Sequence, residues 1–412
     1  MDTHLSSSTS RRLLGSSLAA LGLATAVFAG AATPASADHQ GSPVPSFDYQ
    51  DHALVKPGLS GVGPEAIATG DFNGDGHDDT AVGTIPGLQT ILSNADGTFQ
   101  DAVLHEVGNG TTRQVATADL NDDGNLDIAV SRQAYGEAPK VSVLFGAGDG
   151  AFASPDDIEV GPVIADSWNT ASPIPADVDN DGVPDLVVGI EQLSPLQYTS
   201  VVLLNTGDGT FTDPRAVESA DGVILRRVAD VNGDLFADLV GIKSGEVALV
   251  LADGQGAFGT ARTFPGGVDP LDVAVGDLNG DGKVDLVTVS RLYYVNILQG
   301  TGRGTFSAPT TYTDHFLRSF RLTLVDLNGN GHLDVAAANT WNETFPGTGR
   351  VAVFVGNGDG TLQDVRRYVP VVSSPFTFGI AAGDFNADGR PDLIISNNKN
   401  HDSVTSVLNT TP

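Results

Sequence analysis

Hydrophobic and polar positions alternate along most of this chain in short runs, and clusters of Gly, Asp and Asn separate the runs. In the unit that follows residue 110, apolar runs occupy 114–118, 126–130 and 141–145, and a fourth begins at Phe152. Runs of four to eight residues between turn-forming clusters are typical of β-strands, and this unit has no helical periodicity. The pattern therefore predicts an all-β protein with about four strands per unit.

One polar cluster recurs seven times, and this recurrence defines the architecture. The clusters begin at Asp71, Asp119, Asp177, Asp230, Asp277, Asp326 and Asp384, so that successive starts are 47 to 58 residues apart. Self-similarity at such a period indicates a solenoid, a propeller or an array. Four strands in about 50 residues is the blade of a β-propeller, and we therefore expect seven antiparallel blades.

The two ends of the repeating region complement each other. The seventh repeat stops after a third apolar run at 403–409, whereas residues 46–51 match the fourth strand of other repeats, such as 99–102. We predict that the N-terminal strand completes the last blade and closes the ring. Closure removes the exposed sheet edges that would otherwise pair with other chains.

Each cluster has the ligand spacing of a calcium loop. Oxygen-bearing side chains stand at positions 1, 3, 5 and 9, a glycine usually turns the chain at position 6, and the carbonyl of position 7 adds a backbone ligand. We predict up to seven Ca²⁺ ions. The predicted side-chain ligands are Asp71, Asn73, Asp75, Asp79, Asp119, Asn121, Asp123, Asp127, Asp177, Asp179, Asp181, Asp185, Asp230, Asn232, Asp234, Asp238, Asp277, Asn279, Asp281, Asp285, Asp326, Asn328, Asn330, Asp334, Asp384, Asn386, Asp388 and Asp392.

The loops differ in ways that rank them. The third loop has aspartate at all four positions, so we expect the tightest site there, because calcium affinity rises with ligand charge. The sixth loop has Asn330 at position 5 and should bind most weakly. In the fourth loop Leu235 replaces the position-6 glycine, which predicts a strained turn. Position 12 carries no acid, which excludes an EF-hand. Asp-rich turns without metal remain the alternative.

Charge and cysteine content narrow the function further. The formal net charge is −30, and 21 of the 51 acidic residues lie at the predicted ligand positions. No basic stripe is present, which argues against a nucleic-acid partner. The chain has no cysteine and hence no disulfide bonds. In an exported protein, metal bound in the loops could stabilise the fold in place of disulfides.

Residues 1–37 have the layout of an export signal. Arg11 and Arg12 precede an apolar run at 13–32, and Ala35-Ser36-Ala37 matches a cleavage site. The residues around the two arginines suggest twin-arginine export, with an ordinary secretory signal or an uncleaved anchor as alternatives. We expect a secreted protein in which residues 38–412 form a single propeller. After cleavage it should have no membrane span, and we expect it to be a monomer.

The repeated motif resembles a known family. Residues 68–82 (ATGDFNGDGHDDTAV), with the type of turn found at 203–211 (LLNTGDGTF), are similar to FG-GAP/VCBS repeats such as those of the propeller head of integrin α chains. The resemblance covers 47–409 and implies calcium bound between the first two strands of each blade. It says little of activity, because the family includes adhesins, lectins and non-catalytic domains of enzymes.

The face opposite the calcium loops is the expected ligand face. Antiparallel blades place the second-to-third and the blade-to-blade connections there, and the variable segments include 132–140, 166–175, 191–199, 314–320, 340–350 and 397–402. The candidate ligand residues in these segments are Tyr135, Trp168, Tyr198, His315, Arg318 and Trp341. Aromatic rings beside polar groups suit a sugar or a peptide, although packing of the segments onto the disc is the simpler alternative.

These features predict a secreted, calcium-binding module that binds carbohydrate or an extracellular protein without chemistry of its own. Two alternatives are a polysaccharide lyase or glycoside hydrolase on the same scaffold, and a structural subunit of another exported protein. The chain has no nucleophile elbow, phosphate-binding loop or zinc-protease motif. Carboxylates that come from separate blades could still form a catalytic pair.

Overall fold

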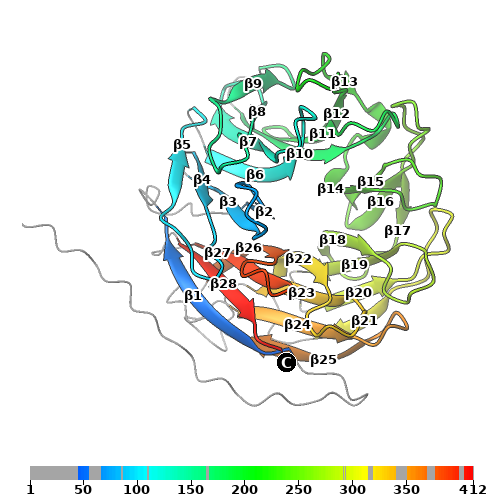
Figure 1. Cartoon of the computed structure of the whole chain (residues 1–412). Coiled ribbons are helices and arrows are strands. Elements are labelled where there is room, and N and C mark those ends of the chain that lie inside the picture. Colours follow the sequence, from blue (N-terminus) through cyan, green and yellow to red (C-terminus); the bar gives the residue numbers. More distant parts are fainter. Residues whose placement is uncertain are drawn as a thin grey trace, which may run out of the picture.

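The computed structural model describes residues 45–54, 66–84, 87–108, 111–163, 167–290, 292, 294–313, 319–339, 350–368, 376–398 and 403–411. Across these residues the chain forms 28 β-strands and one short 3-10 helix, η1 (Glu218–Ala220). The strands form seven blades in a ring around a central axis (Figure 1). The predicted fold class, an all-β seven-bladed propeller, is confirmed.

The first three blades come from the first half of the chain. Blade 1 contains β2 (Ile67–Gly70), β3 (Asp79–Gly83), β4 (Leu88–Ile91) and β5 (Val103–His105). Blade 2 contains β6 (Thr111–Ala118), β7 (Asp127–Tyr135), β8 (Lys140–Leu144) and β9 (Asp156–Glu159), and blade 3 contains β10 (Trp168–Ala176), β11 (Asp185–Leu193), β12 (Leu196–Leu203) and β13 (Arg215–Ala216).

The second half of the chain supplies the other four blades. Blade 4 contains β14 (Ile224–Ala229), β15 (Asp238–Lys243), β16 (Glu246–Val250) and β17 (Arg262–Phe264), and blade 5 contains β18 (Pro270–Gly276), β19 (Asp285–Ser290), β20 (Tyr294–Leu298) and β21 (Thr310–Thr313). Blade 6 contains β22 (Ser319–Val325), β23 (Asp334–Asn339), β24 (Arg350–Gly356) and β25 (Leu362–Tyr368), and blade 7 contains β26 (Phe376–Gly383), β27 (Asp392–Asn398) and β28 (Ser403–Asn409).

The N-terminal strand closes the ring, as predicted. β1 (Phe47–Ala53) pairs antiparallel with β28, in a register that runs from Phe47 opposite Asn409 to Ala53 opposite Ser403. It is the fourth strand of blade 7 (Figure 1). The first strands of all seven blades contact their neighbours around the axis, including β26 with β2 across the closure.

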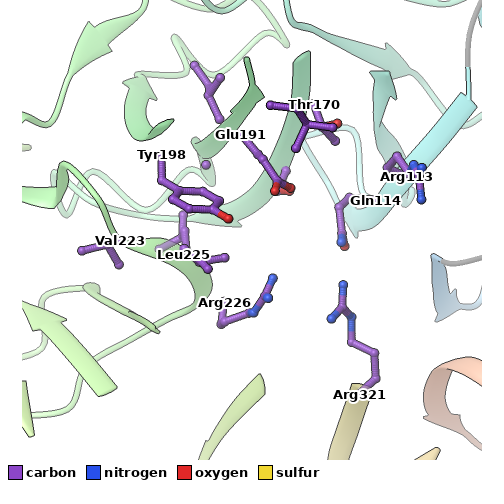
Figure 2. A pocket seen from close by; sticks show the side chains of 14 residues that line it. Arg113, Gln114, Thr170, Glu191, Tyr198, Val223, Leu225, Arg226 and Arg321 are labelled. Atoms are coloured by element: carbon purple, nitrogen blue, oxygen red, sulfur yellow. The ribbon is translucent and has the colours of Figure 1, made fainter. Parts of the chain in front are cut away.

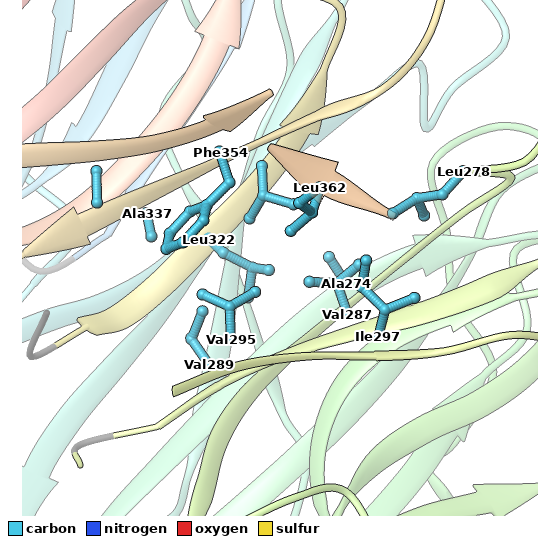
Figure 3. Packing of buried hydrophobic residues seen from close by; sticks show 12 residues of the cluster. Ala274, Leu278, Val287, Val289, Val295, Ile297, Leu322, Ala337, Phe354 and Leu362 are labelled. Carbon is cyan, nitrogen blue, oxygen red and sulfur yellow. The ribbon is translucent and has the colours of Figure 1, made fainter. Parts of the chain in front are cut away.

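The hydrophobic core lies between the blades rather than at the axis. Seven clusters of buried aliphatic and aromatic side chains each join two neighbouring blades. Figure 3 shows one of them, where Val287 and Val295 of blade 5 pack with Leu322 and Phe354 of blade 6. The phenylalanines of the third-to-fourth turns belong to these clusters. Phe152 of blade 2, for instance, makes an edge-to-face contact with Phe72 of blade 1, with the ring centroids 5.5 Å apart.

Blades 2 and 3 have the longest strands of the ring at the face opposite the aspartate loops. The second strand of each blade begins at position 9 of its loop. A longer second strand therefore extends further toward the opposite face. There β10 also pairs with β7, with Trp168 opposite Tyr135, which joins the two blades into one sheet. The segments 132–140, 167–175 and 191–199, which we expected as variable connections, are therefore largely extensions of strands.

Several predicted features fall outside this description. The export signal at 1–37 lies outside the described residues, as do His315, Arg318 and Trp341. Within the described residues, no helix has the length and apolar character needed to cross a membrane.

Candidate functional site

The aspartate at position 9 is the most buried of the predicted side-chain ligands in each loop. All seven are fully buried, and each accepts one hydrogen bond from the N–H of position 2 (2.8–3.1 Å) and one from a backbone N–H at the end of the third strand or two residues beyond it (2.5–2.8 Å). We call these two bonds the position-9 bridge. The bridge fixes the loop against the third-to-fourth turn on the same face.

Burial leaves these carboxylates electrostatically strained. Desolvation raises the pKa of Asp79, Asp185 and Asp238 to about 6 and that of Asp392 to about 7, although the backbone hydrogen bonds oppose the shift. Other carboxylates of the same loops contribute to these raised pKa values: those at positions 1 and 5 for Asp79, Asp238 and Asp392, and those at positions 3 and 5 for Asp185. A cation in the loop would relieve both effects.

The aspartate at position 1 gives the loop its curvature. In all seven loops its Oδ2 accepts a hydrogen bond of 2.7–2.9 Å from the N–H of position 6. This bond requires a left-handed backbone at position 6, where six loops have glycine. In the fourth loop Leu235 takes this conformation with φ +74° and is 83% exposed, which bears out the expected strain.

The residue at position 3 separates the third loop from the others. In the six loops with asparagine, its Oδ1 accepts the N–H of position 5 at 2.8–3.2 Å. In four of them its Nδ2 also donates to the position-5 carboxylate. In those loops the side-chain amide of the position-3 asparagine stabilises the loop conformation by hydrogen bonds to position 5.

The third loop brings three carboxylates together instead. Oxygens of Asp177, Asp179 and Asp185 lie within 4.8 Å of one another. The Oδ1 of Asp179 is buried and has no hydrogen-bond partner. Desolvation, followed by repulsion from Asp181 and Asp177, raises the pKa of Asp179. A converging all-oxygen set with an unpartnered buried oxygen fits a hard cation such as Ca²⁺.

The loops also hold neighbouring blades together. The position-2 carbonyl accepts a hydrogen bond from the third-to-fourth turn of the next blade in several places: Phe72 from the N–H of Gly150 (2.9 Å), Leu120 from Nδ2 of Asn205 (2.7 Å) and Leu327 from Nδ2 of Asn409 (2.7 Å). Order in a loop is thereby coupled to the interface between two blades.

The opposite face holds the predicted ligand residues that the structure describes. Tyr135, at the end of β7, is 54% exposed, and its backbone pairs with Trp168 at the start of β10. Tyr198 lies apart from this pair, on β12, and lines a cavity of 310 Å³ on the axis. The structure therefore divides the expected aromatic group into two places.

The cavity is formed by the first strands of four blades, β6, β10, β14 and β22, and by the long hairpin of β11 and β12 in blade 3. Arg113 and Gln114 come from β6, Arg226 from β14 and Arg321 from β22, while Glu191 and Tyr198 are directly opposite each other on β11 and β12. Figure 2 shows the guanidinium groups of Arg226 and Arg321 directed toward the same space, with Glu191, Tyr198 and Gln114 around it. A second cavity of 270 Å³ shares Gln114, Arg226 and Arg321, so the space continues along the axis.

The arginines and Glu191 are not among the ligand residues predicted from the sequence. Arg113, Arg226 and Arg321 lie four to six residues before the first aspartate of their loops, and hence on first strands. Since first strands line the axis of a propeller, basic residues at these positions were the available signal. Desolvation, the negative charge of Glu191 and a hydrogen bond with it raise the pKa of Tyr198, so that its phenol stays protonated.

The similarity of this chain to known proteins lies in its repeats. A model of the FG-GAP-like repeat matches residues 71–130, 134–188, 230–288 and 326–395, which is more than half of the chain. The chain belongs to the FG-GAP-like repeat family. Integrin alpha-IIb of Mus musculus and of Homo sapiens are each 33% identical to it over 149 residues. These matches cover 30% of this chain and only 14% of either integrin chain.

Solved structures of similar shape share the fold of this FG-GAP-like protein at low identity. A lectin of Agrocybe aegerita, described as recognising non-reducing terminal N-acetylglucosamine, has a TM-score of 0.55 and 19% identity, and the match covers 86% of this chain and 97% of the lectin. BBS1N in complex with ARL6DN has a TM-score of 0.56 and 13% identity, with 87% and 96% covered.

Proposed function

We propose that this chain is an exported, calcium-binding propeller that binds a carbohydrate or a protein surface and carries out no chemistry of its own. The observation that carries the binding function is the cavity on the axis, at the face opposite the aspartate loops. It combines arginine, carboxylate and phenol groups with the apolar side chains of Leu193 and Leu225. A concave site with a few oriented polar groups is typical of small-ligand binding.

Calcium would act as the structural cofactor. The four ligand positions of each loop would hold the ion, up to seven in all, with the third loop the tightest because of Asp177, Asp179 and Asp185. A bound ion supplies positive charge beside the buried position-9 carboxylates. The fixed loops then hold the blades, and with them the ligand face, in one arrangement.

The relatives and the leader support the rest of the proposal. The lectin of similar fold recognises a sugar, and integrin alpha-IIb shares the repeats, so both a carbohydrate and a protein ligand are compatible with this scaffold. The twin-arginine-like leader at 1–37 supports export to an environment where millimolar calcium would fill sites with Kd values of about 10⁻⁴–10⁻³ M.

An enzymatic function is the second candidate, because Glu191, Tyr198 and Arg226 meet in one cavity. A lyase or hydrolase could use the carboxylate as acid or base. Tyr198 is poorly suited as a base, since its raised pKa keeps the phenol protonated at neutral pH.

One assay with two readouts separates these functions. The exported chain in millimolar calcium is incubated with soluble and insoluble polysaccharides, and co-sedimentation and new chain ends are measured together. Binding without new ends is the expected result. New ends would show an enzyme, and the absence of both signals over the whole panel would contradict carbohydrate binding and leave a protein surface as the ligand.

A further inference from the structure

The axis of the propeller has the opposite charge from the rest of the molecule. The chain carries a formal charge of −30, yet Arg113, Arg226 and Arg321 line the cavity with Glu191 as the acid among its lining residues. Arg227 joins Arg226 and Arg321 around the second cavity, whose described lining residues include no acid. A local excess of positive charge on so acidic a protein concentrates anions at this point.

The backbone of the first strands directs these side chains to the axis. β14 is bulged at Arg226, because Leu225 and Arg227 pair with the consecutive residues Gly241 and Val240. β6 has a similar irregularity between Thr112 and Val115, where Arg113 and Gln114 lie. Bulges re-aim side chains and are over-represented beside binding sites. β22 has the same kind of shift between Ser319 and Arg321, so all three strands that supply the arginines are irregular beside them. The shift recurs on β18 and β26 and is thus shared by most first strands of the ring.

Arg226 is fixed at its base and open at its end. Its Nε donates to the carbonyl of Leu271 at 3.0 Å and lies 3.9 Å from Oδ1 of the fully buried Asp272. The other oxygen of Asp272 is 3.5 Å from Arg227 and accepts the N–H of Leu322. Within the described part of the chain, neither Nη atom of Arg226 has a hydrogen-bond partner, and Arg226 lines the cavity.

The arginines also oppose one another. Burial and, next to it, the charge of Arg321 lower the pKa of Arg226 to about 10, and Asp272 only partly compensates. Two guanidinium groups that face one space relieve this repulsion when an anion lies between them. The planar fork of arginine matches a carboxylate in particular, because both oxygens can be bound at once.

The remaining groups of the cavity suit a polyhydroxylated ring rather than a bare anion. Glu191 and Tyr198 form a cross-strand pair on the hairpin that rises beside Arg226. A carboxylate accepts hydrogen bonds from hydroxyl groups, and a phenol ring packs against the apolar face of a sugar. A volume of 310 Å³ is at the lower end of the range for ligand pockets, which suits one sugar residue at a time.

We propose that this cavity binds an acidic sugar residue, with Arg226 and Arg321 holding its carboxylate and Glu191 and Tyr198 contacting its hydroxyls and ring. This inference rests on the proposed carbohydrate-binding function and specifies its ligand class. The carboxylate could belong to a uronic acid or to a sialic acid, which present the same group on different rings.

The test is calorimetric titration of the calcium-loaded chain with matched acidic and neutral sugars. Oligogalacturonate is compared with a galactose oligomer of the same length, sialyllactose with lactose, and inorganic phosphate serves as the simple anion. We expect one acidic sugar to bind at least tenfold more tightly than its neutral counterpart, with affinity that falls as salt is added. Which of the two binds identifies the source of the carboxylate.

Variants assign the interaction to the cavity. Arg321→Gln and Arg226→Gln should each weaken binding of the acidic sugar at least tenfold, and Arg226→Lys, which keeps the charge but not the fork, should fall between. Arg262→Gln, at an exposed position on β17, is the matched control and should bind as the wild type does. Equal melting temperatures in the wild type and Arg321→Gln show that the fold is intact.

Three outcomes would overturn the inference. Equal affinity for the acidic and the neutral sugar would leave the carbohydrate-binding function in place and refute the carboxylate site. Phosphate that competes as well as the free sugar acid would reduce the cavity to a general anion site. Binding of no sugar at all would refute the carbohydrate function together with this inference.

Discussion

The aspartates at positions 3 and 9 of the loops have different functions, although both are predicted ligands. Asp127 at position 9 has both oxygens bonded to backbone N–H groups, so it holds the fold whether or not a cation is present. Asp179 at position 3 has a buried oxygen without a partner and lies beside Asp177 and Asp181. One carboxylate is satisfied by the protein, and the other is suited to a metal.

Substitution of each aspartate by asparagine should separate these functions. Asp127→Asn turns an amide group toward a backbone N–H and should cost on the order of 3 kcal/mol with or without calcium. Asp179→Asn removes like-charge repulsion and gains the internal bond that Asn73 makes, so it should be neutral or slightly stabilising in chelator and destabilising in calcium. Urea unfolding in both conditions measures this. The same calcium dependence in both variants would contradict the distinction.

Leu235 is a position where the chain departs from its own repeat. A left-handed backbone costs a non-glycine residue about 1–2 kcal/mol, and the exposed leucine side chain regains little of this by packing. Leu235→Gly should therefore raise the free energy of unfolding by about 1 kcal/mol. Gly182→Ala at the same position of the third loop is the control: no atom lies within 4 Å of the added Cβ, so its backbone alone should make it destabilising. A destabilised Leu235→Gly would refute the strain.

At the scale of the element, β1 carries the closure of the ring. Its pairing with β28 joins the two ends of the propeller. Within β1, His52 forms a hydrogen bond with Oγ of Ser406 at 2.9 Å and packs in a tilted contact against Phe99, with the ring centroids 4.5 Å apart. Burial lowers the pKa of His52 to about 4. The folded state thus excludes the proton that the unfolded chain takes up near pH 6.5.

The closure should weaken in acid for this reason. Between pH 6.5 and 4 the unfolded chain binds a proton at His52 and the folded chain does not, so stability present above pH 6.5 is lost as the pH falls. The loss is on the order of 2 kcal/mol. In saturating calcium, the stability difference between the wild type and His52→Gln should therefore shrink from pH 7.5 to pH 4.5. A difference that is the same at both values would refute this role for His52, and the measurement at pH 7.5 is the internal control.

Most strands could be predicted from the sequence, and particular residues show which strand extensions could not. The spacing of the loops predicted where the second strand of each blade begins. The match of residues 46–51 to a fourth strand predicted that the N-terminal strand closes the ring. The extension of β7, β10 and β11 was missed because Tyr135, Trp168 and Glu191 read as residues of variable connections. Their strand character comes from pairing between and within blades, which local propensity does not report.

At the scale of the whole molecule, the unpredicted part is the cavity. Arg113, Arg226 and Arg321 come from three different blades and meet only because the ring is closed. The sequence indicates that each stands on a first strand, but it does not show the register shift that each of these strands has beside its arginine. The aspartate loops were predictable because all their ligands lie within nine consecutive residues.

Calcium bound as proposed would act on the whole ring, because the position-2 carbonyl of several loops accepts a hydrogen bond from the next blade. With a Kd near 1 mM, 10 mM calcium would add about 1.4 kcal/mol of stability per filled site. Several sites together would raise the melting temperature of the chain clearly.

The most direct test of the account is the melting temperature of the chain in chelator and in 10 mM calcium, with sodium chloride added to equal ionic strength. The matched salt controls for simple screening of the −30 charge. The account predicts a higher melting temperature in calcium than in either control, with a smaller gain in Asp179→Asn. A melting temperature that is the same in chelator and in calcium would contradict the account of the loops as calcium sites.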